Sequence, residues 1–305
     1  MNHGPLIFLG VLVSFVASWW TFVFAPQVQI GAQQPATVDG ALYPTRRAGL
    51  AEQGREIYVA NGCVHCHSQQ VQQDGFTFDL VLTSAGTNAD AVAKIIAKVV
   101  PGTNATEAVA NASEKNPQAL LRSVPQADAA SAQSALKKAG ATAQVVFIPV
   151  GPDIKRKWGP RRTVAADYLY EYPVQIGNSR LGPDLSNISA RMSDADWHLN
   201  HLYDPRSVMP GSIMPAYRYL FETRPIGKQL SPDALKNLSE KSAPPAGKEI
   251  VPKPEARLLV TYLQSLRIDK PLFEAPMTEL GPPPTAGTNA LAGTNAPAST
   301  NAPAK

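Results

Sequence analysis

The longest apolar stretch of the chain covers residues 5–25 and contains no charged residue. A helix of that length can cross the hydrocarbon layer of a bilayer. Two tryptophans and two phenylalanines lie between Trp19 and Phe24, where an interfacial aromatic belt would lie. A cleaved signal peptide would need a basic start, a shorter apolar core and a small-x-small cleavage site. We therefore predict an uncleaved transmembrane anchor over residues 1–27, followed by a polar linker over residues 28–45.

Two amphipathic segments lie far apart in the chain. From Ala48 the pattern is helical up to Asn61-Gly62, with Gly54 and Tyr58 one turn apart on the same face. Residues 255–266 place Tyr262 and three leucines on one stripe. We predict a helix in each segment.

Residues 74–153 have a pattern of their own, with three strand-like and three helix-like segments. In chain order these are Phe76–Leu82 (strand), Asp90–Val99 (helix), Thr103–Ala112 (helix), Leu120–Val124 (strand), Asp128–Ala139 (helix) and Ala143–Val150 (strand). The order β-α-α-β-α-β predicts a small two-layer α/β domain, inserted into a mainly α fold.

The C-terminal part has fewer signals. Ser231-Pro232-Asp233 predicts the start of another helix, with Pro at its first position. Residues 271–305 consist mostly of Pro, Ala, Gly, Thr and Asn, which cannot bury a core, and we predict a disordered tail. The net charge is +4, but no run of five or more Lys or Arg residues occurs, so binding to nucleic acid is not indicated.

The motif that carries chemistry is Cys63-Val-His-Cys66-His67, a C-x-x-C-H sequence. These are the only two cysteines of the chain. A thioredoxin-like disulfide would want a βαβ context, and a zinc ribbon would want a second cysteine pair. We therefore predict one covalent haem c, bound through Cys63 and Cys66, with His67 as an axial ligand of the iron.

The order of the flanking elements resembles that of small class I cytochromes c. The helix before the motif and the helix over residues 255–266 resemble the crossed terminal helices of that fold, in which a glycine lets the helices approach closely. Gly182-Pro183-Asp184-Leu185 resembles the turn whose proline carbonyl accepts the Nδ1–H of the proximal histidine. Such a bond fixes the tautomer of the ligand. The resemblance implies this contact between Pro183 and His67.

The sixth ligand of the iron should be a thioether or a second imidazole. The candidates are Met192, Met209, Met214, His198 and His201. Met214 is favoured because Pro215 would make its loop rigid and because it lies between the Gly-Pro turn and the last helix. Met209, which also precedes a proline, is the runner-up. The two histidines are predicted on the surface of a short helix that is capped by Ser193.

Several motifs in one order identify a resemblance to a family. They are Gly54–Tyr58, Cys63–Gln69, Trp158-Gly159, Tyr172-Pro173, Gly182–Leu185, Trp197–Arg206 and Met214–Tyr217. Together they resemble the membrane-anchored monohaem subunit of cbb3-type cytochrome c oxidase. The resemblance covers residues 1–73 and about 154–270, and it implies a cytochrome c domain formed by residues 46–73 and 154–270.

The function that this resemblance implies is electron transfer. The subunit would pass single electrons from a dihaem subunit or a cytochrome c to a haem–copper subunit that reduces O₂, so this chain would hold no catalytic residue. It would lie in the inner membrane with its haem domain in the periplasm, and Arg180 is a candidate for contact with a haem propionate. A free membrane-anchored carrier is the alternative. A haem-based sensor, which would need an open iron site, is a third hypothesis.

The inserted segment 74–153 resembles another protein, the C-terminal domain of the large-subunit ribosomal stalk protein. The stretches FDLVL, AVAKIIAKV and ALKKAGATAQV carry the resemblance. The lysine-rich stretch with which the stalk protein binds factors is replaced by residues 101–107. We therefore predict a module that packs on or docks to another subunit, and no role in translation.

Overall fold

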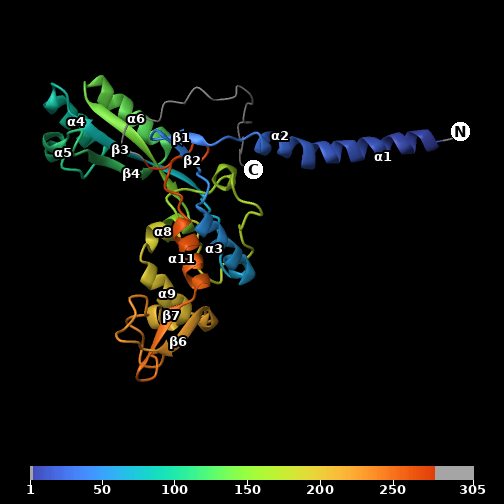
Figure 1. Cartoon of the computed structure of the whole chain (residues 1–305). Helices are drawn as coiled ribbons and strands as arrows, with labels where there is room; N and C mark the ends of the chain where they lie inside the picture. Colours follow the sequence, from blue (N-terminus) through green and yellow to red (C-terminus); the bar gives the residue numbers. More distant parts are fainter. Residues whose placement is uncertain (1–2, 279–305) are drawn as a thin grey trace.

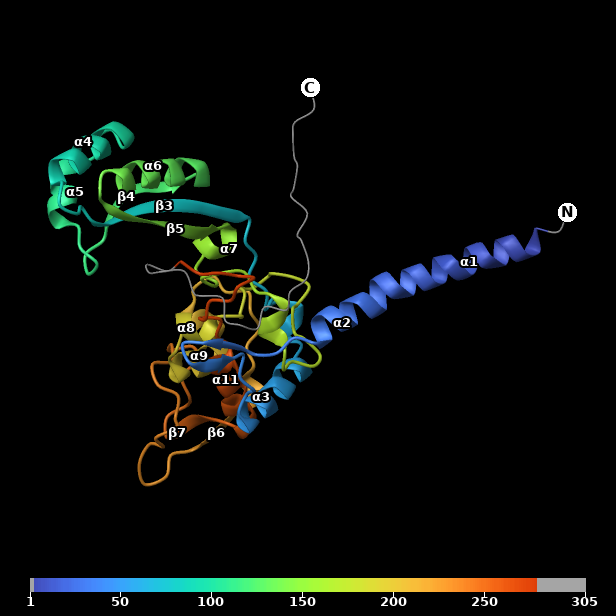
Figure 2. The same ribbon diagram turned by 90° about the horizontal axis from the view of Figure 1, so that it is seen from above.

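The computed structural model describes residues 3–278 (Figure 1). Helix outweighs strand, at about 41% against 16% of these described residues. The first element is a long exposed helix of 26 residues, Gly4–Gln29, which is long and apolar enough to cross a membrane. It extends away from the rest of the molecule (Figure 2).

This N-terminal helix changes its winding before a proline. It consists of α1 (Gly4–Trp19), a π-helical turn (Trp20–Phe24) and α2 (Ala25–Gly31). Pro26 lacks an N–H group, and in an α-helix its ring would clash with the carbonyl group four residues earlier. In the π turn the Ala25 N–H group donates to Trp20 O, five residues earlier rather than the four of an α-helix. The widened turn accommodates the proline without ending the helix.

The predicted linker contains a small hairpin. Strands β1 (Ala36–Val38) and β2 (Ala41–Tyr43) pair antiparallel around Asp39 and Gly40, which both have positive φ. An Asp-Gly turn of this kind matches the twist of a two-residue hairpin. The Tyr43 hydroxyl donates a hydrogen bond of 2.7 Å to Asp167 Oδ1, and this bond attaches the hairpin to the following domain.

Two helices from opposite ends of the sequence cross closely, as predicted. They are α3 (Gly49–Ala60) and α11 (Pro254–Ser265), side by side in both Figures 1 and 2. A Cβ atom at Gly54 would lie 1.9 Å from the Leu258 carbonyl oxygen, so the crossing requires glycine there. The rings of Tyr58 and Tyr262 pack 5.2 Å apart at this contact.

The remaining helices of this domain are short. They are α7 (Pro152–Lys155), α8 (Ile188–Arg191), α9 (Ala195–Tyr203), α10 (Pro205–Val208) and the 3₁₀ turns Cys63–His65, Ala165–Tyr168 and Arg218–Leu220. Helix α9 is capped by the carboxylate of Asp194, which accepts the N–H of Asp196 at 3.0 Å. The prediction of a Ser193 cap was therefore wrong, because the acidic residue after it fills the position.

The inserted segment folds in the predicted order. Its elements are β3 (Gly75–Ser84), α4 (Ala89–Val99), α5 (Ala105–Asn111), β4 (Gln118–Val124), α6 (Gln126–Lys138) and β5 (Thr142–Val150). The strands form an antiparallel sheet in the order β4-β3-β5. Leu80, Leu82, Ile96, Leu120 and Leu136 belong to its hydrophobic core, which is separate from the core around α3 and α11.

The two ends of the insertion lie next to each other. Gly75 and Val150 are register partners in the sheet, and the Asp74 N–H group donates a hydrogen bond of 2.8 Å to Val150 O. The chain therefore leaves and re-enters the main domain at one place.

The predicted helix at Ser231 is wrong. Strands β6 (Phe221–Pro225) and β7 (Lys248–Pro252) form a hairpin, and the segment between them makes turns. The Leu235 N–H group donates to Ile250 O at 2.9 Å, and Asn237 has a φ of 57°. A hydrogen bond to β7 and a left-handed residue both prevent a continuous helix here.

The start of the predicted disordered tail is packed against the main domain. Leu272 and Ala275 are buried and form a β-bridge, and Arg162 donates to Glu274 O at 2.8 Å. These contacts extend the ordered chain past residue 270. Residues 279–305, the rest of the predicted tail, lie outside the described residues.

Candidate haem site

The C-x-x-C-H motif lies directly after helix α3. The helix ends at Asn61, and Gly62 adopts a left-handed conformation with a φ of 66°. The Cys66 and His67 N–H groups then both donate to Cys63 O, at 3.1 and 3.0 Å. This single turn keeps both thiols close to the histidine, and neither cysteine is in a disulfide.

The imidazole of His67 is held by the Gly-Pro turn in the way the resemblance implied. Its Nδ1 lies 2.7 Å from the Pro183 carbonyl oxygen. A Cβ atom at Gly182 would lie 2.2 Å from His67 Cε1, so only glycine leaves room for the ring. Since a carbonyl only accepts, Nδ1 carries the proton and Nε2 presents its lone pair. Within residues 3–278, Nε2 has no hydrogen-bond partner.

The pKa values of two groups, His67 and Cys63, fit a metal ligand and an unreactive thiol. Burial lowers the pKa of His67, which keeps the imidazole in the neutral form that binds iron. Burial raises the pKa of Cys63 to about 11. A redox cysteine pair needs a lowered thiol pKa, so the surroundings of Cys63 argue against a disulfide oxidoreductase. The residues present therefore fit a covalent haem with His67 as a ligand.

The two favoured methionines differ in their surroundings. Met214 is partly buried and packs against the same core cluster as Cys63 and Tyr217. Met209 is 50% exposed. Met192 also packs against that cluster, as a packing residue would. The structure thus favours Met214 over Met209 by burial.

The two histidines of helix α9 differ in burial: His198 is buried, not on the predicted helix surface, whereas His201 is half-buried. His198 is buried, and its Nε2 lies 2.8 Å from Met192 O. His201 stacks on the Trp197 ring at 4.8 Å. Burial, with the nearby charges of His67 and His198, lowers the pKa of His201 to about 4. His198 is therefore engaged in a structural contact, and His201 remains a candidate ligand with a neutral ring.

Arg180, the candidate for a propionate contact, makes three contacts within the protein. Its guanidinium donates to Ser68 Oγ at 3.1 Å, to Asp153 Oδ1 at 2.9 Å and to Gln70 O at 2.5 Å. The propionate contact of Arg180 stays a prediction.

Arg191 is a second arginine near the site, and the sequence did not single it out. It donates to the Asp184 main-chain oxygen, its Nε is buried without a partner, and it has no ion pair within the described chain. Burial lowers its pKa, and its charge acts on His67. A buried guanidinium without an ion pair is suited to bind an anionic group. The sequence alone does not show this burial.

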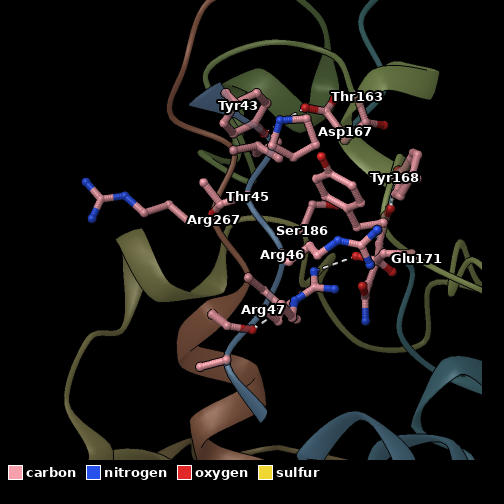
Figure 3. A pocket seen from close by; sticks show the side chains of 17 residues that line it. Tyr43, Thr45, Arg46, Arg47, Thr163, Asp167, Tyr168, Glu171, Ser186 and Arg267 are labelled. Carbon is pink, nitrogen blue, oxygen red and sulfur yellow. Dashed lines mark hydrogen bonds and ion pairs between the residues drawn. The ribbon is translucent and has the colours of Figure 1, made fainter. Parts of the chain in front are cut away.

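A separate cavity of about 340 Å³ lies between the linker and the main domain (Figure 3). Arg47 and Glu171 form an ion pair in it, and the Arg46 guanidinium lies 4.5 Å from the centre of the Tyr170 ring. None of the predicted haem ligands lines this cavity. Between residues 3 and 278, no group of three or more His, Cys, Asp or Glu side chains could hold a further metal ion.

Part of the chain matches a known family. Residues 149–250 match the sequence model of a family described as "Cytochrome C oxidase, mono-heme subunit/FixO". The match contains the Gly-Pro turn, both arginines and both favoured methionines, but not the C-x-x-C-H motif. In that family a haem is expected, and further oxidase subunits are implied. No curated protein matches the chain.

Proposed function

We propose that this protein is the one-electron-transfer subunit of a cbb3-type cytochrome c oxidase. The family match supports the oxidase, and the His67 ring between Gly182 and Pro183 is the observation that carries the haem. Cys63 and Cys66 hold one haem c covalently. When bound, this haem supplies a centre that takes up and gives off one electron.

The residues of the chain prepare this site in advance. Pro183 fixes the tautomer of His67, which strengthens Nε2 as a ligand. Met214 would supply a thioether ligand to the haem iron, and Met/His ligation favours a high reduction potential. Arg180 and Arg191 offer N–H donors to the haem propionates. The apolar core around Tyr58 supports the site, because Cys63 and Met214 both pack against it.

The proposed partners follow from the chemistry that this chain cannot perform. O₂ reduction needs four electrons and an open metal, whereas a ligand-saturated haem passes one electron at a time. A haem–copper subunit of the same oxidase accepts the electrons, and a dihaem subunit or a cytochrome c supplies them. The helix Gly4–Gln29 anchors the chain in the inner membrane with the haem domain on the periplasmic side. Anchoring raises the effective concentration of the partner sites.

The insertion is proposed to pack on or dock to another subunit. Its likeness to the ribosomal stalk domain rests on its sequence and on the predicted order of its helices and strands. The structure has its helices and strands in the same order. The proposal gives it no role in translation.

A denaturing gel stained for haem-linked peroxidase activity tests covalent attachment. Wild type should stain at the size of the chain, and the double variant Cys63→Ala/Cys66→Ala should not. Staining of the double variant would sink the proposed haem site.

Purification in mild detergent tests the oxidase assembly. The chain should elute with a haem–copper subunit. Elution as a lone 32.6 kDa chain that carries electrons would favour the free-carrier alternative. Binding of CO to the reduced, isolated chain would indicate an open iron and would favour the sensor.

A further inference from the structure

Two backbone segments run side by side at the His67 ring. The Gly182 N–H group donates to Cys66 O at 2.9 Å, and the Leu185 N–H group donates to Ser68 O at 2.8 Å. These bonds lie on either side of the contact between His67 Nδ1 and the Pro183 carbonyl oxygen. The orientation of the imidazole therefore depends on how firmly the two segments are joined.

One carboxylate joins the two segments. Asp184 is completely buried, at 0% exposure. Its Oδ2 accepts hydrogen bonds from Ser68 Oγ at 2.6 Å and from the Gln70 N–H group at 2.7 Å. Its Oδ1 accepts from the Ser186 N–H group at 2.8 Å. Donors from both segments thus converge on a single side chain.

The negative charge of Asp184 is not cancelled by a direct ion pair. Within residues 3–278, no Lys, Arg or His side chain forms a salt bridge with it, and Arg191 donates to its main-chain oxygen rather than to the carboxylate. Burial lowers the pKa of His67, and the charge of Asp184 opposes this lowering, so the carboxylate acts electrostatically at the ring.

A second layer of polar contacts fixes the Ser68 side of this arrangement. Arg180 Nε donates to Ser68 Oγ at 3.1 Å, and the same guanidinium pairs with the buried Asp153. The Gln72 N–H group donates to Asp153 Oδ2 at 2.8 Å. Ser68 is therefore held in place, and it donates its hydroxyl proton towards Asp184.

We propose that Asp184 is a positioning residue for His67 and that its buried charge lowers the midpoint potential of the haem. The proposal rests on the proposed haem function. A negative charge near the iron stabilises the oxidised state, which carries one more positive charge. The hydroxyl of Ser68 partly offsets this charge.

Two variants of the purified full chain test the proposal with opposite expected signs. Asp184→Asn removes the charge while keeping the shape, so the midpoint potential should rise. Ser68→Ala removes one donor but keeps the carboxylate, so the potential should fall. Asp233→Asn is the control, because Asp233 is exposed and pairs with Arg257 away from this site. It should leave the potential unchanged.

Each outcome of the redox titration decides the question. An unchanged potential in haem-loaded Asp184→Asn, even with a lower melting temperature, would show a structural role only and would overturn the proposal. If Asp184→Asn yields no haem-loaded protein, the Ser68→Ala variant alone tests the proposal. A midpoint potential in Ser68→Ala that is unchanged or higher than in wild type would then overturn the proposal. Absence of haem in wild type would defeat the proposed function itself, which the stained gel detects separately.

Discussion

Met214 and Met209 each precede a proline, but only Met214 is partly buried against the core on which Cys63 also packs. We expect Met214→Ala to remove the weak far-red absorbance of a methionine–iron bond and to lower the midpoint potential, because Met/His ligation raises it. Met209→Ala is the matched control and should leave both unchanged. The measurement is the oxidised spectrum together with a redox titration. The reverse result would move the ligand to Met209.

His198 makes the stability of the fold depend on pH. Its imidazole is buried, and burial lowers its pKa below that in the unfolded chain. Below about pH 6.5 the unfolded chain therefore binds a proton that the folded chain does not. Each such proton removes about 1.4 kcal/mol of unfolding free energy per pH unit as the pH falls.

The corresponding variant is His198→Gln, whose amide can still donate to Met192 O. Denaturant unfolding at pH 7.5 and 5.5 should show a loss of stability in wild type and a smaller loss in the variant. Some loss should remain, because burial also lowers the pKa of His201, to about 4. An equal loss in both proteins would contradict the assignment to His198.

Single residues differ in how much the sequence reveals about them. Cys63, His67 and Pro183 belong to motifs, so their local geometry could be predicted. Asp184 lies in the same motif, but its role depends on donors from residues more than a hundred positions away in the sequence. Arg191 belongs to no motif. What marks it is burial without a counterion, and only the three-dimensional structure shows that.

At the scale of elements, the crossing of α3 and α11 gives a direct test. In Gly54→Ala the new Cβ atom would lie 1.9 Å from Leu258 O, and backbone atoms cannot move aside. The helices must separate, so we expect a loss of about 2 kcal/mol or more, beyond the gain in helix propensity. Gly49→Ala in the same helix has nothing within 4 Å of its Cβ and should be neutral or slightly stabilising. Chemical denaturation measures both, and equal stabilities would contradict the close crossing.

Hydrophobic periodicity predicted the elements that pack against segments close to them in the sequence. All six elements of the insertion have clear patterns, and their order in the structure is the predicted one. The β6–β7 hairpin was missed because its two strands are separated by a long segment with no strand signal between them. The helix predicted at Ser231 failed for a related reason, since the N–H group of Leu235 pairs with β7. Long-range pairing of this kind overrides local propensity.

At the scale of the whole molecule, residues 3–278 hold two separate hydrophobic cores. The core of the insertion and the core around α3 share no residue. The connection consists of the neighbouring ends at Gly75 and Val150, followed by Asp153, which binds Arg180. A unit with its own core and adjacent ends can fold independently of its host. The insertion should therefore be removable without disturbing the haem.

Replacing residues 75–150 with a short Gly/Ser linker tests this independence. Paired Cα atoms in an antiparallel sheet lie about 5 Å apart, so two or three linker residues can join Asp74 to Gly151. We expect the haem spectrum and the midpoint potential to remain those of wild type, because Asp153 and Arg180 stay in place. Asp153→Asn in the full chain is the contrasting variant, and it should shift the potential by loosening Arg180 and Ser68. A lost or altered spectrum in the linker variant would mean that the insertion helps to build the haem pocket.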